Sequence, residues 1–140
     1  MPPLSPIIIV DDDKDDQDLI RQVCERLNIK NNLIVFENGE DVYNYLLTST
    51  EQPFLILCDI NMPMIDGLHL RRRIEQDEVL KRKAIPFVFL TTSASKRQVN
   101  EAYSMTIQGF FEKGDSFEKL TRRMELIMEY WKDCKHPNSV

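Results

Sequence analysis

Five short apolar runs, separated by longer stretches with helical spacing, constrain the fold of this chain most strongly. The runs occupy residues 7–10, 33–36, 54–58, 87–90 and 109–112. Short, nearly continuous apolar runs are typical of strands buried on both faces, as in a parallel sheet. After each run, apolar residues recur three or four positions apart, which predicts an amphipathic helix. The alternation of five strands with five helices predicts a doubly wound α/β domain with right-handed crossovers.

Local signals indicate where several of these helices begin and end. Asn38, followed by acidic residues, predicts an N-cap. The segment 115–118 resembles a capping box that opens the last helix, and residues 136–138 end it. A long connection, 77–86, precedes the fourth strand. The three arginines at 71–73 are expected on the solvated face of a helix.

Length, charge and cysteine content exclude several classes of protein. A chain of 140 residues predicts one domain. Its net charge of −5 argues against a nucleic-acid partner, and the apolar runs are far too short to span a membrane. Cys24, Cys58 and Cys134 form no C-x-x-C pair, which indicates a reduced cytoplasmic chain without a zinc site.

Polar side chains that can transfer a phosphoryl group follow four of the five predicted strands. In doubly wound folds the site lies beyond the carboxyl ends of the strands, where this sequence places Asp11, Asp12, Asp59, Thr91 and Lys113. Neighbouring carboxylates need a cation, and Mg²⁺ prefers oxygen ligands. A carboxylate beside Mg²⁺ can attack a phosphoryl group and form an acyl phosphate. Phosphoryl transfer depends mainly on positioning and on neutralisation of charge.

The sequence resembles the receiver domain of two-component response regulators. Residues 59–67, DINMPMIDG, fit the family motif D-x-x-M-P-x-x-D-G. The acid pair, the threonine and the lysine occur in the family's order. The resemblance implies a flavodoxin-like, three-layer (βα)5 sandwich with strand order 2-1-3-4-5. It further implies a receiver domain over residues 6–133, short tails at 1–5 and 134–140, and no output domain.

The resemblance also assigns roles to individual residues. It implies that Asp59 is the phosphoacceptor, and that Mg²⁺ is held by Asp59, directly by Asp12, through water by Asp11 and by the backbone carbonyl of Asn61. The backbone N–H of Thr92 and the ammonium of Lys113 would contact the phosphoryl group. Thr91 would be the switch hydroxyl, and Phe110 the aromatic residue that rotates on activation. A sensor histidine kinase or a phosphotransfer protein would be the donor, and an unidentified protein would receive the signal. The implied protein is no enzyme beyond self-phosphorylation and autodephosphorylation.

Two features refine this resemblance. The connection 77–86 ends in Ala-Ile-Pro and resembles a stand-alone subgroup that answers phytochrome-type and related kinases. Gly114 stands where the family usually has proline after the lysine. Because a cis bond before a non-proline residue costs about 2.5–4 kcal/mol, we expect a trans Lys113–Gly114 peptide and a junction more mobile than in relatives with proline. We also expect Gly114→Pro to keep phosphorylation and to reposition the last helix.

Two other functions fit parts of the sequence. The opening IIIVDDD also fits haloacid-dehalogenase-type phosphatases, with Asp11 as nucleophile and Asp13 as acid, although Asp15 replaces the usual threonine or valine. That reading leaves the motif around Asp59 unexplained. The second alternative is a binding module on a receiver scaffold that is never phosphorylated. Two measurements separate the receiver domain from these two alternatives: Mg²⁺ binding, and the identity of the aspartate that carries the phosphoryl group.

Overall fold

Five parallel strands form the central sheet, in the order β2-β1-β3-β4-β5. The predicted strand order and doubly wound class are therefore confirmed. The computed structural model describes residues 4–137. Its elements, in chain order, are β1 (Ile7–Val10), α1 (Lys14–Arg26), β2 (Leu33–Phe36), α2 (Gly39–Thr48), β3 (Leu55–Cys58), α3 (Gly67–Gln76), α4 (Glu78–Lys83), β4 (Phe87–Thr91), α5 (Lys96–Tyr103), β5 (Gly109–Glu112) and α6 (Phe117–Asp133).

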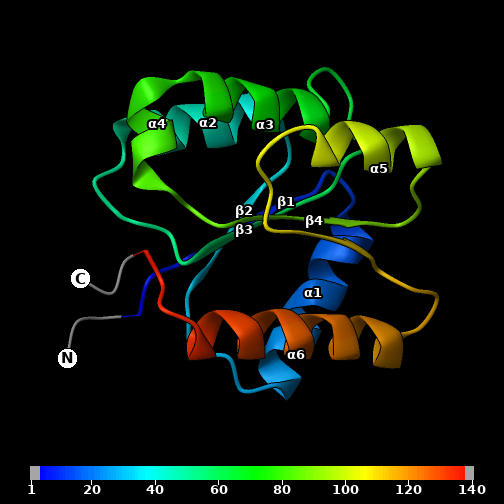
Figure 1. Ribbon diagram of the computed structural model, residues 1–140. Coiled ribbons are helices and arrows are strands. Elements are labelled where there is room, and N and C mark those ends of the chain that lie inside the picture. Colours follow the sequence, from blue (N-terminus) through cyan, green and yellow to red (C-terminus); the bar gives the residue numbers. More distant parts are fainter. Residues whose placement is uncertain (1–3, 138–140) are drawn as a thin grey trace.

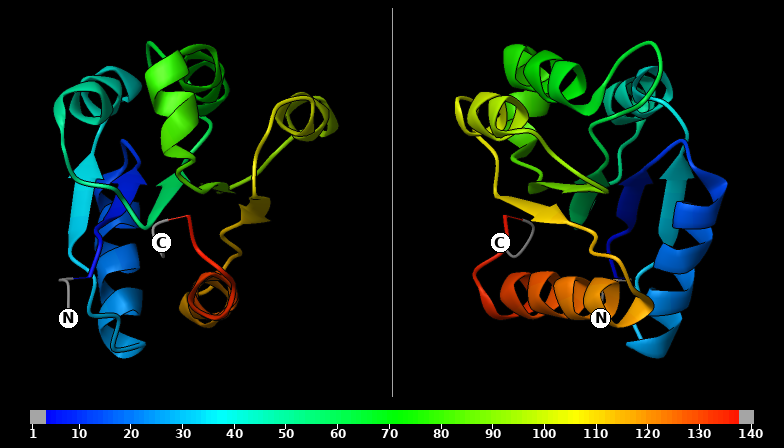
Figure 2. Two further views of the ribbon diagram at one scale, coloured as in Figure 1. Left: turned by 60° about the vertical axis from the view of Figure 1, so that its left-hand side comes forward. Right: turned by 90° about the vertical axis from the view of Figure 1, so that its right-hand side faces the viewer.

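The helices cover both faces of the sheet and make a three-layer molecule. The helices α2, α3, α4 and α5 lie on one face, whereas α1 and α6 lie on the other (Figure 1). Two further views show the sheet between these layers (Figure 2). Among residues 4–137, no helix has the length and apolar character needed to cross a membrane.

Alternating side chains of the central strands fill two separate cores. Ile8 and Val10 of β1 pack with residues of α2 to α5. Ile7 and Ile9 face the other way and pack with residues of α1 and α6. Since β1, β3 and β4 are buried along their whole length, their sequences are apolar on both faces, as the continuous runs predicted.

Several boundaries differ from the predicted ones. The strand β3 begins at residue 55 rather than 54, and β4 extends to Thr91. The helix α6 starts after Ser116, whose side chain accepts from the Lys119 N–H, so a serine cap replaces the predicted capping box. It ends at Asp133, and the predicted stop therefore lies too late.

The connection 77–86 contains an additional helix, α4, that the periodicity did not predict. Asp77 ends α3 and also caps α4, because its side chain accepts from the N–H groups of Val79 and Leu80. Ala84 then adopts a left-handed conformation and terminates the helix. This double use of Asp77 turns the chain sharply between α3 and α4.

The arginine run at residues 71–73 is only partly solvated, which corrects the prediction for Arg71. The inner face of α3 carries Gly67, Leu70, Arg71 and Ile74, spaced by three and four residues, and all four are buried. Arg73 points outward instead and pairs with Glu40 at 2.7 Å. Helical geometry therefore places Arg71 against the sheet.

Candidate functional site

Four strands bring the predicted site residues to one edge of the sheet. Asp11 follows β1, Asp59 follows β3, Thr91 ends β4 and Lys113 follows β5. All four residues are buried. The N–H of Asp59 donates to the carbonyl of Val10 at 2.8 Å, and the N–H of Lys113 donates to the carbonyl of Thr91 at 2.8 Å. Backbone hydrogen bonds of the sheet thus fix these residues relative to one another.

Three carboxylates from β1 and β3 form the acidic part of the site. One oxygen each from Asp11, Asp12 and Asp59 lies within 4.8 Å of the other two. Asp12 is exposed, whereas Asp11 and Asp59 are buried. This set of oxygen donors fits a hard divalent cation such as Mg²⁺, and Asp12 leaves one side open for its entry and its remaining waters.

A buried lysine lies beside the carboxylates. The Lys113 ammonium contacts Asp11 Oδ2 at 2.6 Å and Asp16 Oδ2 at 2.8 Å. Burial alone would lower the pKa of Lys113, but the two carboxylates outweigh it and the pKa lies above its ordinary value. For Asp11, burial dominates and raises the pKa to about 6, although the hydrogen bond from Lys113 opposes this. The lysine therefore stays charged and acts as the local counter-ion.

The Asp59 carboxylate is oriented through one of its two oxygens. The Thr91 hydroxyl donates to Asp59 Oδ1 at 2.7 Å. The backbone N–H of Ile60 donates to the same oxygen at 2.8 Å. Because both bonds end on Oδ1, Oδ2 is the oxygen that remains for an incoming group.

The loop after Asp59 explains why the motif ends in Asp-Gly. Asp66 caps α3 by accepting from the His69 N–H at 2.8 Å. The N–H of Gly67 donates to the carbonyl of Ile60 at 2.9 Å. A Cβ at Gly67 would overlap the carbonyl oxygen of Asp59. The glycine therefore lets α3 approach the loop after Asp59 closely.

Asn61 and Thr92 lie at the exposed rim of the site. The Asn61 side chain accepts from Gln98 Nε2 of α5 at 3.0 Å. Thr92 is exposed and directly follows the buried Thr91. For both residues the predicted role belongs to a backbone atom, so their exposed side chains do not conflict with it.

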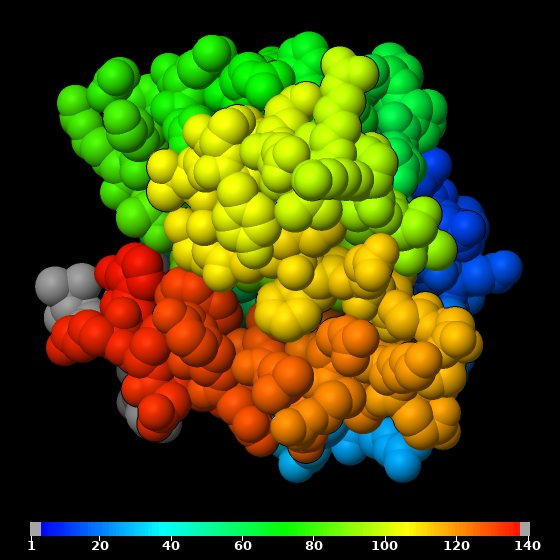
Figure 3. Space-filling view, turned by 45° about the vertical axis from the view of Figure 1, so that its right-hand side comes forward, coloured from blue at the N-terminus to red at the C-terminus, as the bar shows by residue number. Residues whose placement is uncertain are grey.

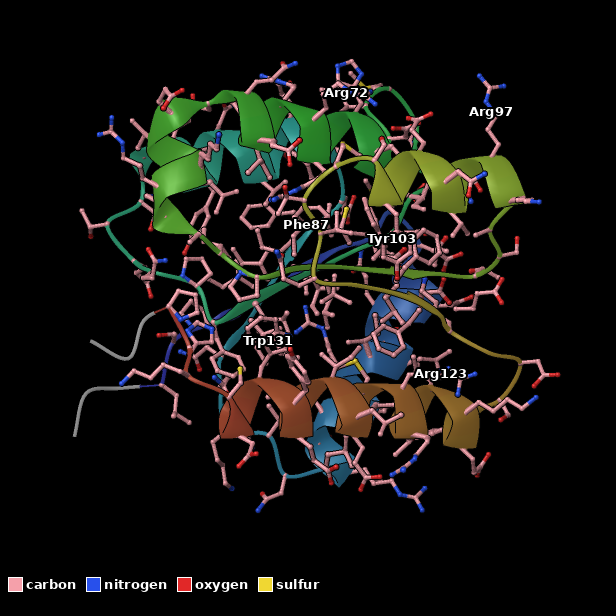
Figure 4. The ribbon with its side chains drawn as sticks, in the orientation of Figure 1. Arg72, Phe87, Arg97, Tyr103, Arg123 and Trp131 are labelled. Atoms are coloured by element: carbon pink, nitrogen blue, oxygen red, sulfur yellow. The ribbon has the colours of Figure 1, made fainter. Side chains whose placement is uncertain are left out.

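Phe110 in β5 lies between a core aromatic ring and an exposed one. Its ring centre lies 5.7 Å from that of Phe89 in β4 and 6.4 Å from that of Tyr103 in α5. Tyr103 extends from α5 toward the sheet edge (Figure 4). Phe110 itself is half-buried. An aromatic stack thus joins the core beside β4 to the exposed surface of α5.

Asp13 and Asp16 have clear roles that the sequence did not assign. The Asp13 side chain caps α1 by accepting from the N–H groups of Asp15 and Asp16. It therefore serves the helix rather than the acid function of the phosphatase alternative. Asp16 is the second partner of Lys113. Its position in the first turn of α1, the helix that directly follows β1, was a usable signal.

The sheet order and this cluster together define a flavodoxin-like domain with an acidic, lysine-containing site. The chain belongs to the response regulator receiver domain family, whose model matches residues 7–125. It is therefore a signalling domain of two-component systems. The phosphatase alternative does not account for this match.

Relatives and solved structures agree with the assignment. The response regulator Rcp1 of Synechocystis is 31% identical over 134 residues, which cover 92% of this chain and 90% of the relative. A probable methanogenesis regulatory protein, FilR2, of Methanothrix harundinacea is 33% identical over 129 residues, covering 89% and 82%. The phosphorylated cyanobacterial phytochrome response regulator RcpA superposes with a TM-score of 0.86 at 26% identity, covering 96% of this chain and 99% of that chain. The Mn²⁺-bound form of Rcp1 gives 0.82 at 28% identity, covering 94% and 97%.

Proposed function

We propose that Asp59 accepts a phosphoryl group from a sensor histidine kinase or a phosphotransfer protein. The observation that carries the proposal is the orientation of its carboxylate. Thr91 and the Ile60 N–H hold Oδ1, while Asp11 and Asp12 lie within 4.8 Å. Oδ2 would bond to phosphorus as the P–N bond of the donor phosphohistidine breaks and its electron pair returns to the imidazole. The product is an acyl phosphate.

Mg²⁺ would be held by Asp11, Asp12, Asp59 and the backbone carbonyl of Asn61, and it would neutralise charge on the transferring phosphoryl. Lys113 would shift from its carboxylate partners to a phosphoryl oxygen, and the Thr92 N–H would contact another. Both groups would stabilise the negative charge that the phosphoryl group brings to the site. Attack of water on phosphorus would later release phosphate and restore Asp59, so the only reactions are self-phosphorylation and autodephosphorylation.

We further propose that the signal leaves through the surface of α5, β5 and α6. These elements form one continuous face (Figure 3). The phosphoryl group would draw the Thr91 hydroxyl from Asp59, and Phe110 would reorient in response. The switched face would contact a downstream protein.

We take residues 6–133 as the receiver domain and the cytoplasm as the place where it meets its kinase.

Intact-mass measurement tests the proposal directly. Incubation with acetyl phosphate and Mg²⁺ should add one phosphoryl group, about 80 Da. Asp59→Asn should abolish the adduct, whereas Asp18→Asn, at an exposed site on α1, should retain it. A full adduct on the Asp59→Asn protein would contradict the assignment. Mg²⁺ binding without any adduct on the wild-type protein would favour the alternative of a binding module.

A further inference from the structure

A cavity of about 250 Å³ opens near the amino-terminal ends of the strands, whereas Asp59 lies at their carboxyl ends. It lies between α3, α4 and the segments that enter β4 and β5. Its buried wall is apolar and consists of Ile56, Ile74, Leu80 and Ile85. Exposed polar residues, among them Lys81 and Gln108, lie at its mouth. The cavity is therefore apolar inside and polar at its opening.

The buried polar group in this wall is the guanidinium of Arg71. Arg71 is only 8% exposed, and its Nε makes no hydrogen bond with any residue that the structure describes. Its Cζ lies 5.2 Å from the centre of the Phe87 ring. Phe87 itself lies between the sheet and the α3–α4 layer (Figure 4). Arginine remains protonated in proteins, and a buried charge without hydrogen bonds is costly. The cavity thus contains a cation with unused hydrogen-bonding capacity.

Neighbouring charges leave the cavity positive. Glu75 also lines it and partly offsets the charge of Arg71, because burial lowers the pKa of Arg71 and the Glu75 carboxylate opposes that shift. Glu75 Oε1 also accepts the N–H of Thr106 at 2.6 Å. Lys81 adds a second cation at the mouth. Arg72, next to Arg71 in the chain, differs from it because it is exposed and pairs with Glu101 at 3.4 Å. Two cations against one engaged carboxylate favour an anionic ligand.

We propose that this cavity binds a small monocarboxylate with a compact apolar body. The planar guanidinium fork matches a carboxylate and forms charge-assisted hydrogen bonds with it. The apolar wall would cover an aromatic ring or a short aliphatic chain, and the other cation of the lining, Lys81, lies at the mouth. The volume is below the range typical of drug-sized ligands, so the ligand is small. The site lies at the opposite edge of the sheet from Asp59 and does not depend on the proposed phosphorylation.

Titration with benzoate, followed by ¹H–¹⁵N NMR, tests the proposal on the full chain. Benzoate should shift the Nε–Hε signal of Arg71 and the amide signals of Ile74 and Ile85 in a saturable manner. Benzamide has nearly the same shape without charge and should bind at least about tenfold more weakly, because a hydrogen bond between charged groups is lost. Acetate lacks the apolar body and should also bind much more weakly. These comparisons use the wild-type protein and need no variant.

Two substitutions complete the test. Arg71→Met keeps an unbranched apolar stem without the guanidinium and should abolish benzoate binding, whereas Arg72→Met, at the exposed neighbour, should retain it. Absence of a saturable shift with benzoate, or equal affinity for benzoate and benzamide, would overturn the proposal. Equal affinity for acetate would overturn the role of the apolar wall. Binding that survives in a folded Arg71→Met protein would overturn the role of the guanidinium.

Discussion

Asp12 and Asp13 are adjacent in the chain, but their carboxylates have different neighbours. Asp12 lies with Asp11 and Asp59, whereas Asp13 caps α1. Asp12→Ala should therefore lose most of the Mg²⁺ affinity in calorimetry. Asp13→Ala should retain that affinity but lose about 1 kcal/mol of stability to urea, the usual cost of removing an N-cap. Equal losses of Mg²⁺ affinity in both variants would contradict this division.

Asp16 controls how readily Lys113 can leave its resting position. The ammonium is held by Asp11 and Asp16 at 2.6 and 2.8 Å, yet the proposed function needs it at the phosphoryl group. Asp16→Asn removes one charged anchor, so we expect a several-fold gain in affinity for beryllofluoride, a phosphoryl analogue. The same variant should lose about 1 kcal/mol of stability, because a buried cation loses a partner.

Asp15→Asn is the matched control for this prediction. Asp15 is exposed in the same helical turn, and Lys113 contacts Asp11 and Asp16 rather than Asp15. The control variant should bind beryllofluoride like the wild-type protein. Weaker binding by Asp16→Asn would mean that Asp16 positions the lysine productively instead of retaining it.

At the scale of elements, the junction between β5 and α6 depends on Gly114. The Lys113–Gly114 peptide is trans, as predicted, and Gly114 has a φ of 84°. Proline is restricted to a φ near −65°, and a Cβ at this position would lie 2.7 Å from Cβ of Lys119. Proline at position 114 should therefore strain this junction, while the retention of phosphorylation in Gly114→Pro stays a prediction.

Gly114→Ala and Gly114→Pro should accordingly both destabilise the protein. Alanine at a positive φ costs about 1 kcal/mol or more, and proline should cost more because the backbone must also rearrange. Urea denaturation measures both losses. Gly39→Ala is a useful control, since Gly39 begins α2 and the nearest atoms to its Cβ would be side-chain atoms of Ile65 at 3.2 Å and of Leu70 at 3.5 Å. Wild-type stability of Gly114→Pro would show that the junction rearranges freely.

The elements that the sequence predicted are those with a strong local signal. Continuous apolar runs located all five strands to within one residue at their ends. For β1, β3 and β4 the reason is burial on both faces, which favours apolar residues throughout. The helix α4 spans only Glu78–Lys83, which is too short for a periodic pattern. The pairing of Asp16 with Lys113 joins residues 97 positions apart. The burial of Arg71 depends on which face of α3 packs against the sheet. Three consecutive arginines do not indicate which of them lies on that face.

At the scale of the whole molecule, the two edges of the sheet contain unlike sites. The carboxyl edge gathers three carboxylates, one of which, Asp11, pairs with the buried ammonium of Lys113. The opposite edge contains a buried guanidinium in an apolar cavity. Each edge keeps charge that the fold does not fully compensate. Such uncompensated charge lowers stability and is available for a ligand of opposite sign.

Because negative charge is in surplus at the carboxyl ends of the strands, removal of the Asp59 carboxylate should stabilise the metal-free protein. Asp59→Asn removes one of three neighbouring carboxylates, while the amide oxygen can still accept from Thr91 and the Ile60 N–H. Because like charges repel and the hydrogen bonds remain, the free energy of unfolding should rise by about 1–2 kcal/mol in EDTA. Mg²⁺ should then stabilise the wild-type protein by mass action and Asp59→Asn much less. Thermal unfolding with and without Mg²⁺ measures both effects, and Asp18→Asn should show neither. A lower melting temperature of Asp59→Asn in EDTA would instead mean that the carboxylate is already neutralised within the fold.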